Sequence, residues 1–312
     1  MLSGSTTIEL VSTAKMVIVG SVLFGASFMD VRYRRIPDRF WMLMLLGAGP
    51  LTFWEMALKG GVDSPLTFLS LLLPVSGVLF IFFGYPELKE AFKGSAADIL
   101  FFMIYAGGMI GGAVAFGLGD RQLFAPIGIS FIFMVVYFVL YSVPIGGTRL
   151  IHGGADAKCL ISLAALFPWY VLDLSYQIGP FYNTLDEIGS MGAIFPFHLS
   201  VFFNAAVLTG LVIIVIIPVR NILKNEFSLS SFTSYRLDID DIRRKHVWIV
   251  LEEEGRRKKE EPVPGLIRKL RERGEKRVLV TPKIPFILSL AVGMLVQVFF
   301  GNIVAALFLT LS

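Results

Sequence analysis

Cysteine and histidine are scarce in this sequence of 312 residues, and each shortage excludes a kind of site. The single cysteine, Cys159, excludes an intrachain disulfide framework and a four-cysteine zinc site. The three histidines, His152, His198 and His246, are far apart and show no metal-ligand spacing. No nucleophile motif accompanies the serines and histidines, so serine-protease chemistry is unsupported. We therefore expect neither a metal nor another cofactor.

Charge is also scarce, at 17% of residues, whereas soluble domains carry about 25%. Hydrophobic residues make up 55% and gather in several runs of about 20 residues, the length that crosses the roughly 30 Å hydrocarbon layer of a bilayer. This composition predicts an integral membrane protein. The start of the chain, Met1–Leu10, lacks a basic region and a small-residue cleavage site, so we expect the first apolar run to be retained rather than removed as a signal peptide.

The apolar runs predict an all-α membrane protein, a bundle of about eight transmembrane helices with a polar insert before the last helix. The predicted division is a catalytic bundle over 1–219, an insert over 220–283 and a final helix over 284–312. The expected spans are Glu9–Met29, Phe40–Leu58, Leu66–Gly84, Ile99–Leu118, Leu123–Ile145, Ala155–Leu172, Phe195–Val219 and Ile284–Leu311.

The distribution of basic residues predicts the orientation of these spans. Asp30–Arg39, the first connection, holds four arginines, which favours the cytoplasmic side. The long connection Asp173–Ile194 has no Lys or Arg and falls on the opposite side in the same arrangement. We therefore expect a multi-pass protein of the cell membrane with both termini outside.

The insert is basic, with 17 basic and 11 acidic residues over 220–283. Two readings stay open: a small α/β or helical domain, with a strand over His246–Leu251 and a helix over Leu266–Arg273, or a solvated cytoplasmic loop. A basic face could contact anionic lipid head groups. Nucleic acid is not an expected partner, because charges of both signs are mixed without an aromatic stacking pattern.

Two aspartates carry the candidate chemistry. Asp30 closes the first apolar run and Asp156 opens the sixth, so the predicted topology brings both to the cytoplasmic face at similar depth. Ionisable groups at membrane depth are costly and usually functional. Like charges at close range cannot both ionise easily, so one carboxylate could activate water while the other, protonated, donates to a peptide carbonyl. The small residues Gly153, Gly154 and Ala155 would let a substrate backbone approach Asp156.

A purely structural reading competes with this one. An aspartate at a membrane edge is often solvated or paired with a nearby Arg or Lys, and Arg32, Arg34 and Lys158 are available for that. Lys158 itself points away from Asp156 on a helix, and we expect it to hold a lipid phosphate or to adjust the ionisation of Asp156. Two roles stay open for Asp38, Glu87 and Asp98. They are either solvated or receive a basic substrate segment.

Three short motifs resemble those of the type IV prepilin peptidases and the archaeal preflagellin (prearchaellin) peptidases. Asp30–Arg39 reads DVRYRRIPDR and resembles their first signature, an Asp followed by Arg and then Ile-Pro with a polar residue. Gly153–Lys158 reads GGADAK and resembles the Gly-x-Gly-Asp signature of these membrane aspartyl proteases. Pro282–Ile287 reads PKIPFI and resembles the Pro-Phe that opens their last span.

The resemblance implies that Asp30 and Asp156 are the catalytic pair. It also implies the substrates: prepilin or prearchaellin precursors, whose short basic leader precedes a hydrophobic helix and is cut off at the cytoplasmic face. The sequence departs from the signature at Ala155, where glycine is expected. This departure favours a resemblance to the archaeal branch of the family. Any need for positive φ there would be costly for alanine. No methyl-donor site is visible, so we expect peptidase activity only.

Other classes remain open at this point. A transporter with a carboxylate proton relay would place its charges near the bilayer midplane, often at the broken helices of inverted repeats, and no repeat is visible. A scaffold of a pilus or secretion assembly would use the insert for docking. A presenilin-like protease shares the Gly-x-Gly-Asp element, but the context of Asp30 fits the prepilin group better.

Overall fold

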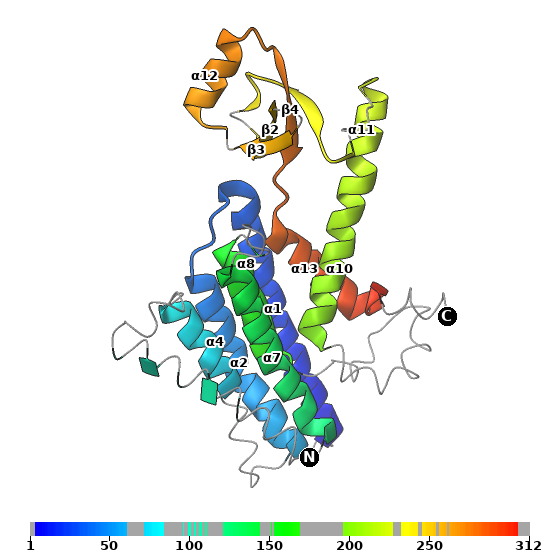
Figure 1. Ribbon diagram of the computed structural model, residues 1–312. Helices are drawn as coiled ribbons and strands as arrows, with labels where there is room; N and C mark the ends of the chain where they lie inside the picture. Colours follow the sequence, from blue (N-terminus) through cyan, green and yellow to red (C-terminus); the bar gives the residue numbers. More distant parts are fainter. Residues whose placement is uncertain are drawn as a thin grey trace. The chain divides into compact units, whose positions relative to one another are not determined.

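The computed structural model describes residues 4–60, 72–83, 96, 99–100, 103, 106–107, 110, 121–143, 151, 153–168, 196–226, 232–242, 245–253, 256–260 and 262–304 (Figure 1). Two compact units are present. The helical unit comprises Met1–Ala205 with Phe286–Ser312, and the sheet unit comprises Ala206–Pro285. Relative to the division expected from the sequence, residues 206–219 and 284–285 group with the sheet unit.

The described part of the chain is mostly helical. The long helix that begins at Phe197 changes to π-helical hydrogen bonding over η2 and returns to α-helix in α11. The helices outside the insert are α1 (Gly4–Tyr33), α2 (Arg39–Gly60), α4 (Leu72–Phe83), α7 (Arg121–Ser142), α8 (Gly154–Leu166), α10 (Phe197–Leu211), η2 (Val212–Ile216), α11 (Ile217–Leu223) and α13 (Phe286–Phe300).

Among the residues that the structure describes, three helical stretches are long and apolar enough to cross a membrane: Thr6–Tyr33, Arg39–Lys59 and Phe197–Leu223. Pro126–Ser142 and Phe286–Phe300 are apolar but shorter. These lengths fit a multi-pass membrane protein, with fewer full-length spans among the described residues than the eight expected. The expected span Leu66–Gly84 is described over 72–83, where it forms α4, and most of the expected span Ile99–Leu118 lies outside the described residues.

The expected sixth span, Ala155–Leu172, is shorter than predicted. Helix α8 has 13 residues and ends at Leu166, so at 1.5 Å per residue it is about 20 Å long, less than a bilayer core. Every residue from Cys159 to Leu166 is buried, and α8 contacts α2, α4, α7 and α13. A helix that is covered on all sides belongs to the interior of a bundle, so α8 is the central helix of the helical unit.

The expected last span, Ile284–Leu311, is wrong as a single helix. Helix α13 ends at Phe300 because Gly301 takes the left-handed conformation, with φ of 81°, a common helix ending. The buried side chain of Asn204 satisfies the backbone there: its Nδ2 donates to the Gly301 carbonyl at 3.0 Å, and its Oδ1 accepts from the Ile303 N–H at 3.0 Å.

Helices α10 and α13 approach closely at Gly293. A Cβ atom at this position would lie 2.6 Å from the Val201 carbonyl oxygen and 2.8 Å from the Ala205 nitrogen. Small residues allow such backbone contact between helices where side chains would hold them apart. Gly293 therefore sets the distance between these two helices.

The described residues of the sheet unit form four antiparallel strands in the order β1-β4-β2-β3. Its core is formed by alternate strand residues such as Val247, Ile249 and Val280 together with Ile267 and Leu270 of helix α12. This sheet corrects the all-α class and bears out the α/β reading of the insert, including its strand near His246–Leu251 and its helix near Leu266–Arg273. The elements are β1 (Tyr235–Asp238), β2 (Val247–Glu253), β3 (Arg256–Glu260), α12 (Pro264–Glu272) and β4 (Arg277–Pro282).

Candidate active site

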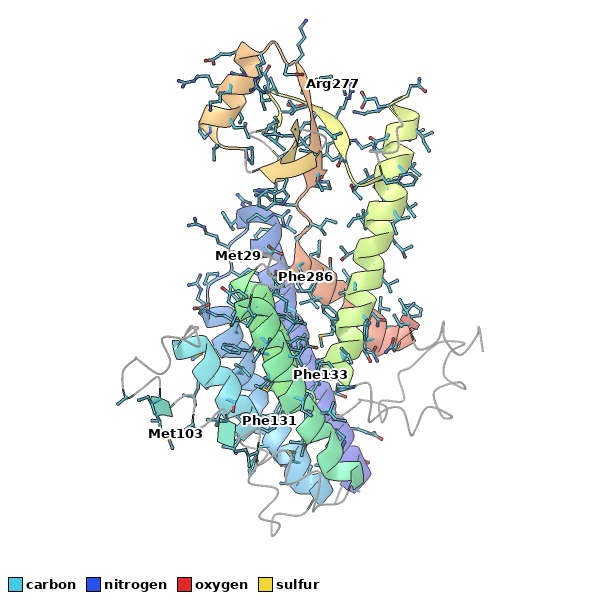
Figure 2. All side chains as sticks on the ribbon, in the orientation of Figure 1. Met29, Met103, Phe131, Phe133, Arg277 and Phe286 are labelled. Carbon is cyan, nitrogen blue, oxygen red and sulfur yellow. The ribbon has the colours of Figure 1, made fainter. Side chains whose placement is uncertain are left out.

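Asp30 lies three residues before the end of α1 and is partly buried. Its Oδ2 accepts a hydrogen bond from the Ile287 N–H at 3.2 Å. Ile287 is the second residue of α13, whose first N–H groups have no partner within the helix. Asp30 therefore caps α13 from a different helix, and α1 also packs along α13. Figure 2 shows Met29, the residue before Asp30, and Phe286, the residue before Ile287, at the same end of these helices.

Arg34 contacts Asp30 through both its backbone and its side chain. Its N–H donates to the Asp30 carbonyl at 3.1 Å, its φ is 54°, and α1 ends there, three residues before Pro37. The same residue brings its Nη1 to 4.0 Å from Asp30 Oδ1. The reading of Asp30 as the partner of a nearby arginine thus holds for Arg34, and it coexists with the contact to Ile287.

Asp156 is the third residue of α8. Gly153 directly precedes this helix and has φ of −96° and ψ of 123°. The Asp156 N–H donates to the Gly153 carbonyl at 3.1 Å. A Cβ atom added to Gly153 would lie 2.4 Å from Asp156 Oδ2 and 2.8 Å from its Cγ. Gly153 is thus required by space rather than by backbone conformation, because the carboxyl group of Asp156 rests against it.

Gly154 and Ala155 form the first turn of α8. The positive-φ residues other than glycine in the described part of the chain are Arg34 and Asn225. Ala155 is helical, so its departure from the glycine of the signature has no conformational cost. Its side chain packs against the hydrophobic core of the helical unit.

The structure brings the two candidate carboxylates to one end of the helical unit. The C-terminal end of α1 and the N-terminal end of α8 lie at the same end of the bundle (Figure 1). Asp30 and Asp156 are close enough for their charges to interact, although they are 126 positions apart in the sequence. They have different surroundings: Asp30 contacts a backbone N–H and a guanidinium, and Asp156 rests on Gly153.

Lys158 pairs with Asp38, which sequence reasoning did not predict. Its Nζ lies 2.7 Å from Asp38 Oδ1, and the side chain of Lys158 is 12% exposed while that of Asp38 is 57% exposed. The expectation that Lys158 holds a lipid phosphate is replaced by this ion pair, and Asp38 is neither simply solvated nor without a partner. His152, Glu87 and Asp98, also considered from the sequence, lie outside the described residues.

A fully buried ion pair lies far from this site. Lys15 Nζ of α1 and Glu55 Oε2 of α2 are 2.5 Å apart, with side chains 2% and 4% exposed, and Lys59 Nζ is 3.3 Å from the other carboxylate oxygen. Fifteen residues of helix separate Lys15 from Asp30, which is about 22 Å. The signal for this pair was present in the sequence, as single charges inside two apolar runs.

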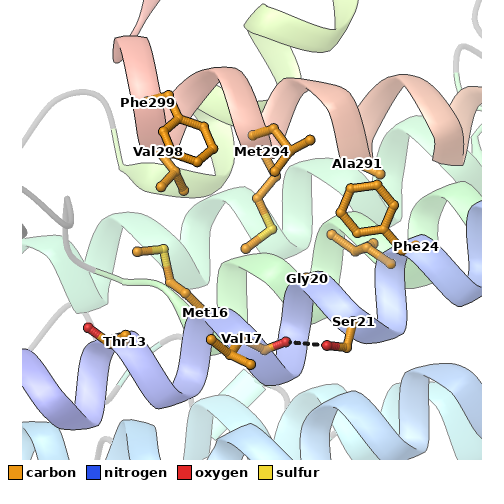
Figure 3. Close-up of a pocket in the computed structure, with 12 residues that line it drawn as sticks. Thr13, Met16, Val17, Gly20, Ser21, Phe24, Ala291, Met294, Val298 and Phe299 are labelled. Carbon is orange, nitrogen blue, oxygen red and sulfur yellow. Dashed lines mark hydrogen bonds between the residues drawn. The ribbon is translucent and has the colours of Figure 1, made fainter. Parts of the chain in front are cut away.

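An apolar pocket of about 420 Å³ opens between α1 and α13. Figure 3 shows Met16, Phe24 and Met294 lining it, with the hydrogen bond from Ser21 Oγ to the Val17 carbonyl at 2.7 Å. No ionisable side chain lines it, so this pocket offers no group for acid–base chemistry. Among the residues that the structure describes, no group of three metal-ligating side chains occurs either.

The sequence matches no protein-family model, no curated protein and no solved structure at a significant level. The functional reading therefore depends on the three motifs and on the geometry of the residues within them.

Proposed function

We propose that this protein is a membrane aspartyl endopeptidase that removes the short basic leader from type IV prepilin-like or prearchaellin precursors at the cytoplasmic face. The observation that supports this most is the convergence of Asp30 and Asp156, whose charges interact although they come from different helices. The contact between Asp30 and Ile287 adds the third motif to the other two. The proposed site needs neither a metal nor a cofactor.

The chemistry that we propose is hydrolysis without a covalent intermediate. Carboxylates at close range resist simultaneous ionisation and can share one proton. We assign the negative charge to Asp30, because a backbone N–H and a guanidinium stabilise a carboxylate. We assign the proton to Asp156.

In this scheme Asp30 takes a proton from water as the water oxygen attacks the scissile carbonyl carbon. Asp156 donates its proton to the carbonyl oxygen. Collapse of the resulting diol breaks the C–N bond, and the leaving amine takes the proton from Asp30 while Asp156 recovers its own. The step is balanced, and both carboxyl groups return to their starting states.

Co-expression with a prepilin or archaellin precursor tests the proposal directly. Leader loss, followed as a shift on a gel, should occur with the wild type and be abolished by Asp30→Asn and by Asp156→Asn. Asp240→Asn is the matched control, since it makes the same change at an exposed aspartate of the sheet unit that pairs with Arg271. Cleavage persisting in either Asp30→Asn or Asp156→Asn, at equal protein level, would defeat the assignment of the pair.

The transporter alternative gains one observation, the buried Lys15–Glu55 pair inside the apolar helices. This pair separates the two functions experimentally. A transporter predicts ion flux in proteoliposomes that is lost on Glu55→Gln and no processing of precursors, whereas the peptidase predicts processing that depends on Asp30 and Asp156.

A further inference from the structure

The apolar pocket between α1 and α13 is a groove that the proposed chemistry does not use. Its described lining residues all belong to these two helices, over positions 13–24 of α1 and 291–299 of α13. On both helices they recur mostly at spacings of three and four, so each helix turns one continuous stripe toward the groove (Figure 3). We call it the α1–α13 groove.

The groove forms because α1 and α13 touch at one end and separate beyond it. At the contact, Asp30 Oδ2 accepts a hydrogen bond from the Ile287 N–H at 3.2 Å, and Ser27 Oγ lies 3.3 Å from the Ile287 carbonyl oxygen. Figure 3 shows the two helices converging toward Phe24 and Ala291, the groove residues nearest to this contact. Phe24 precedes Asp30 by six residues, or about 9 Å of helix. The groove therefore begins beside one of the two proposed catalytic residues.

Small residues and large apolar ones line the groove together. Gly20 and Ser21 are among the small ones, and a Cβ atom added to Gly20 would meet no atom within 4 Å. Val17, Phe24 and Phe299 are large and exposed. Exposed apolar side chains alone indicate only contact with lipid chains. Open space in front of a glycine adds more, because small residues allow the backbone of another helix to approach closely in a membrane.

We propose that the α1–α13 groove receives the hydrophobic helix that follows the leader of the precursor, an inference that rests on the proposed peptidase function. The continuity of the groove with Asp30 supports it. A helix that leaves the scissile bond and runs in the direction of α13 reaches the groove after about six residues and follows it for about eleven more. The occupant is apolar, because the described lining includes no ionisable side chain.

Disulfide cross-linking in membranes tests where the helix lies. The enzyme carries a single new cysteine, Val17→Cys or Phe24→Cys, in a Cys159→Ala background that removes the native cysteine. Asp156→Asn keeps the precursor intact, and the precursor carries one cysteine at successive positions after the cut. Leu46→Cys is the matched control, because Leu46 and Val17 are both 62% exposed and Leu46, in α2, does not line the groove.

The two groove positions should give different registers. We expect cross-linking to peak about 13 residues after the cut for Val17→Cys and about 6 residues after it for Phe24→Cys, because these residues precede Asp30 by 13 and 6 positions. Cross-linking to Leu46→Cys should stay at background.

Filling the groove should weaken binding of the precursor. Gly20→Leu places a side chain in the open space, so KM should rise about tenfold or more. The kcat should change little, because the groove holds the same part of the precursor before and during cleavage. Gly210→Leu is the control, since a Cβ atom there also meets nothing within 4 Å and Gly210 does not line the groove. Thermal unfolding verifies that both variants are folded.

The outcomes distinguish this inference from the peptidase proposal. Failure of the wild type to cleave a precursor that cross-links in the expected register would defeat the peptidase function and leave the groove as a helix site. Cleavage without these cross-links, equal cross-linking to Leu46→Cys, or an unchanged KM in Gly20→Leu would overturn the inference. Cross-linking of two enzyme copies through Val17→Cys, in place of the precursor, would also overturn it and assign the groove to a second copy.

Discussion

Lys158 Nζ lies 2.7 Å from Asp38 Oδ1, and this ion pair joins the helix that carries Asp156 to the loop that follows Asp30. The two residues are 120 positions apart, and each belongs to a different one of the two aspartate motifs. Lys158 is largely buried, so the pair connects the N-terminal part of α8 to the residue that precedes α2.

Removing one partner of this pair should destabilise the protein. Asp38→Asn and Lys158→Met should each lower the free energy of unfolding by about 1 kcal/mol, and the double variant by less than the sum, because the second change finds the pair already broken. Equilibrium unfolding in mixed micelles measures the coupling. Glu272→Gln is the control, since its pair with Arg268 is exposed on both sides and is worth about 0.5 kcal/mol or less.

The same pair should affect leader cleavage. Reversing both charges, with Asp38→Lys and Lys158→Asp together, should retain more cleavage than either single reversal, because only the double variant restores the attraction. The gel assay of precursor processing checks this, with protein level as reference. Equal loss in the single and double reversals would show that the link between the two motifs does not support the site.

A side chain at position 153 should disturb Asp156. In Gly153→Ala the new methyl group would occupy the space of the Asp156 carboxyl group, 2.4 Å from Oδ2, so the carboxyl must turn away and cleavage should be lost with little loss of fold. Gly210→Ala is the control, because a Cβ there has no neighbour within 4 Å. Precursor processing and thermal unfolding are measured together, and full activity of Gly153→Ala would contradict the proposed position of Asp156.

Breaking the Lys15–Glu55 pair should destabilise the protein more than removing both of its charges. Glu55→Gln leaves a buried ammonium with its strongest partner gone and should cost about 3–5 kcal/mol. The double variant Lys15→Met with Glu55→Leu removes both charges and should recover most of that loss. Lys59→Gln, at the more exposed end of the cluster, should cost less. Denaturation by sodium dodecyl sulfate in mixed micelles ranks the four proteins.

Packing at Gly293 gives a prediction for the helical unit alone. Gly293→Ala places a methyl group 2.6 Å from the Val201 carbonyl oxygen, so α10 and α13 must separate, at a cost of about 1–3 kcal/mol. Gly20→Ala makes the same change in α1 where no atom lies within 4 Å, and it should stabilise slightly, since alanine favours helix over glycine. The two thermal midpoints should therefore shift in opposite directions.

Local patterns in the sequence were sufficient for much of the fold. Apolar runs predicted the long helices α1 and α2, and one of the two readings of the insert placed a strand near β2 and a helix near α12. Hydropathy could not predict where α8 and α13 end. Those endings depend on burial in the bundle and on Asn204, which is remote in sequence from the backbone groups that it satisfies.

For the candidate site, the motifs predicted which aspartates to examine but not their partners. Ile287, Lys158 and Asp38 make their contacts across at least 120 positions of sequence. No periodicity encodes such pairs. The Pro-Phe motif came closest to predicting a partner. It marks the start of a helix, and a helix start needs acceptors for its first N–H groups. The role of Gly153 was assigned to the approach of a substrate, and the structure gives it a nearer occupant, the carboxyl group of Asp156.

The buried Lys15–Glu55 contact also bears on how the chain is made. Glu55 leaves the ribosome about 40 residues after Lys15, so for that interval a lone ammonium would have to sit in hydrocarbon. Charges of opposite sign on α1 and α2 favour entry of the two segments into the bilayer as a hairpin, each neutralising the other. Glycosylation-site mapping of a chain ending before α2 should therefore show poorer membrane integration of α1 than in the longer chain, with Lys15→Leu restoring it.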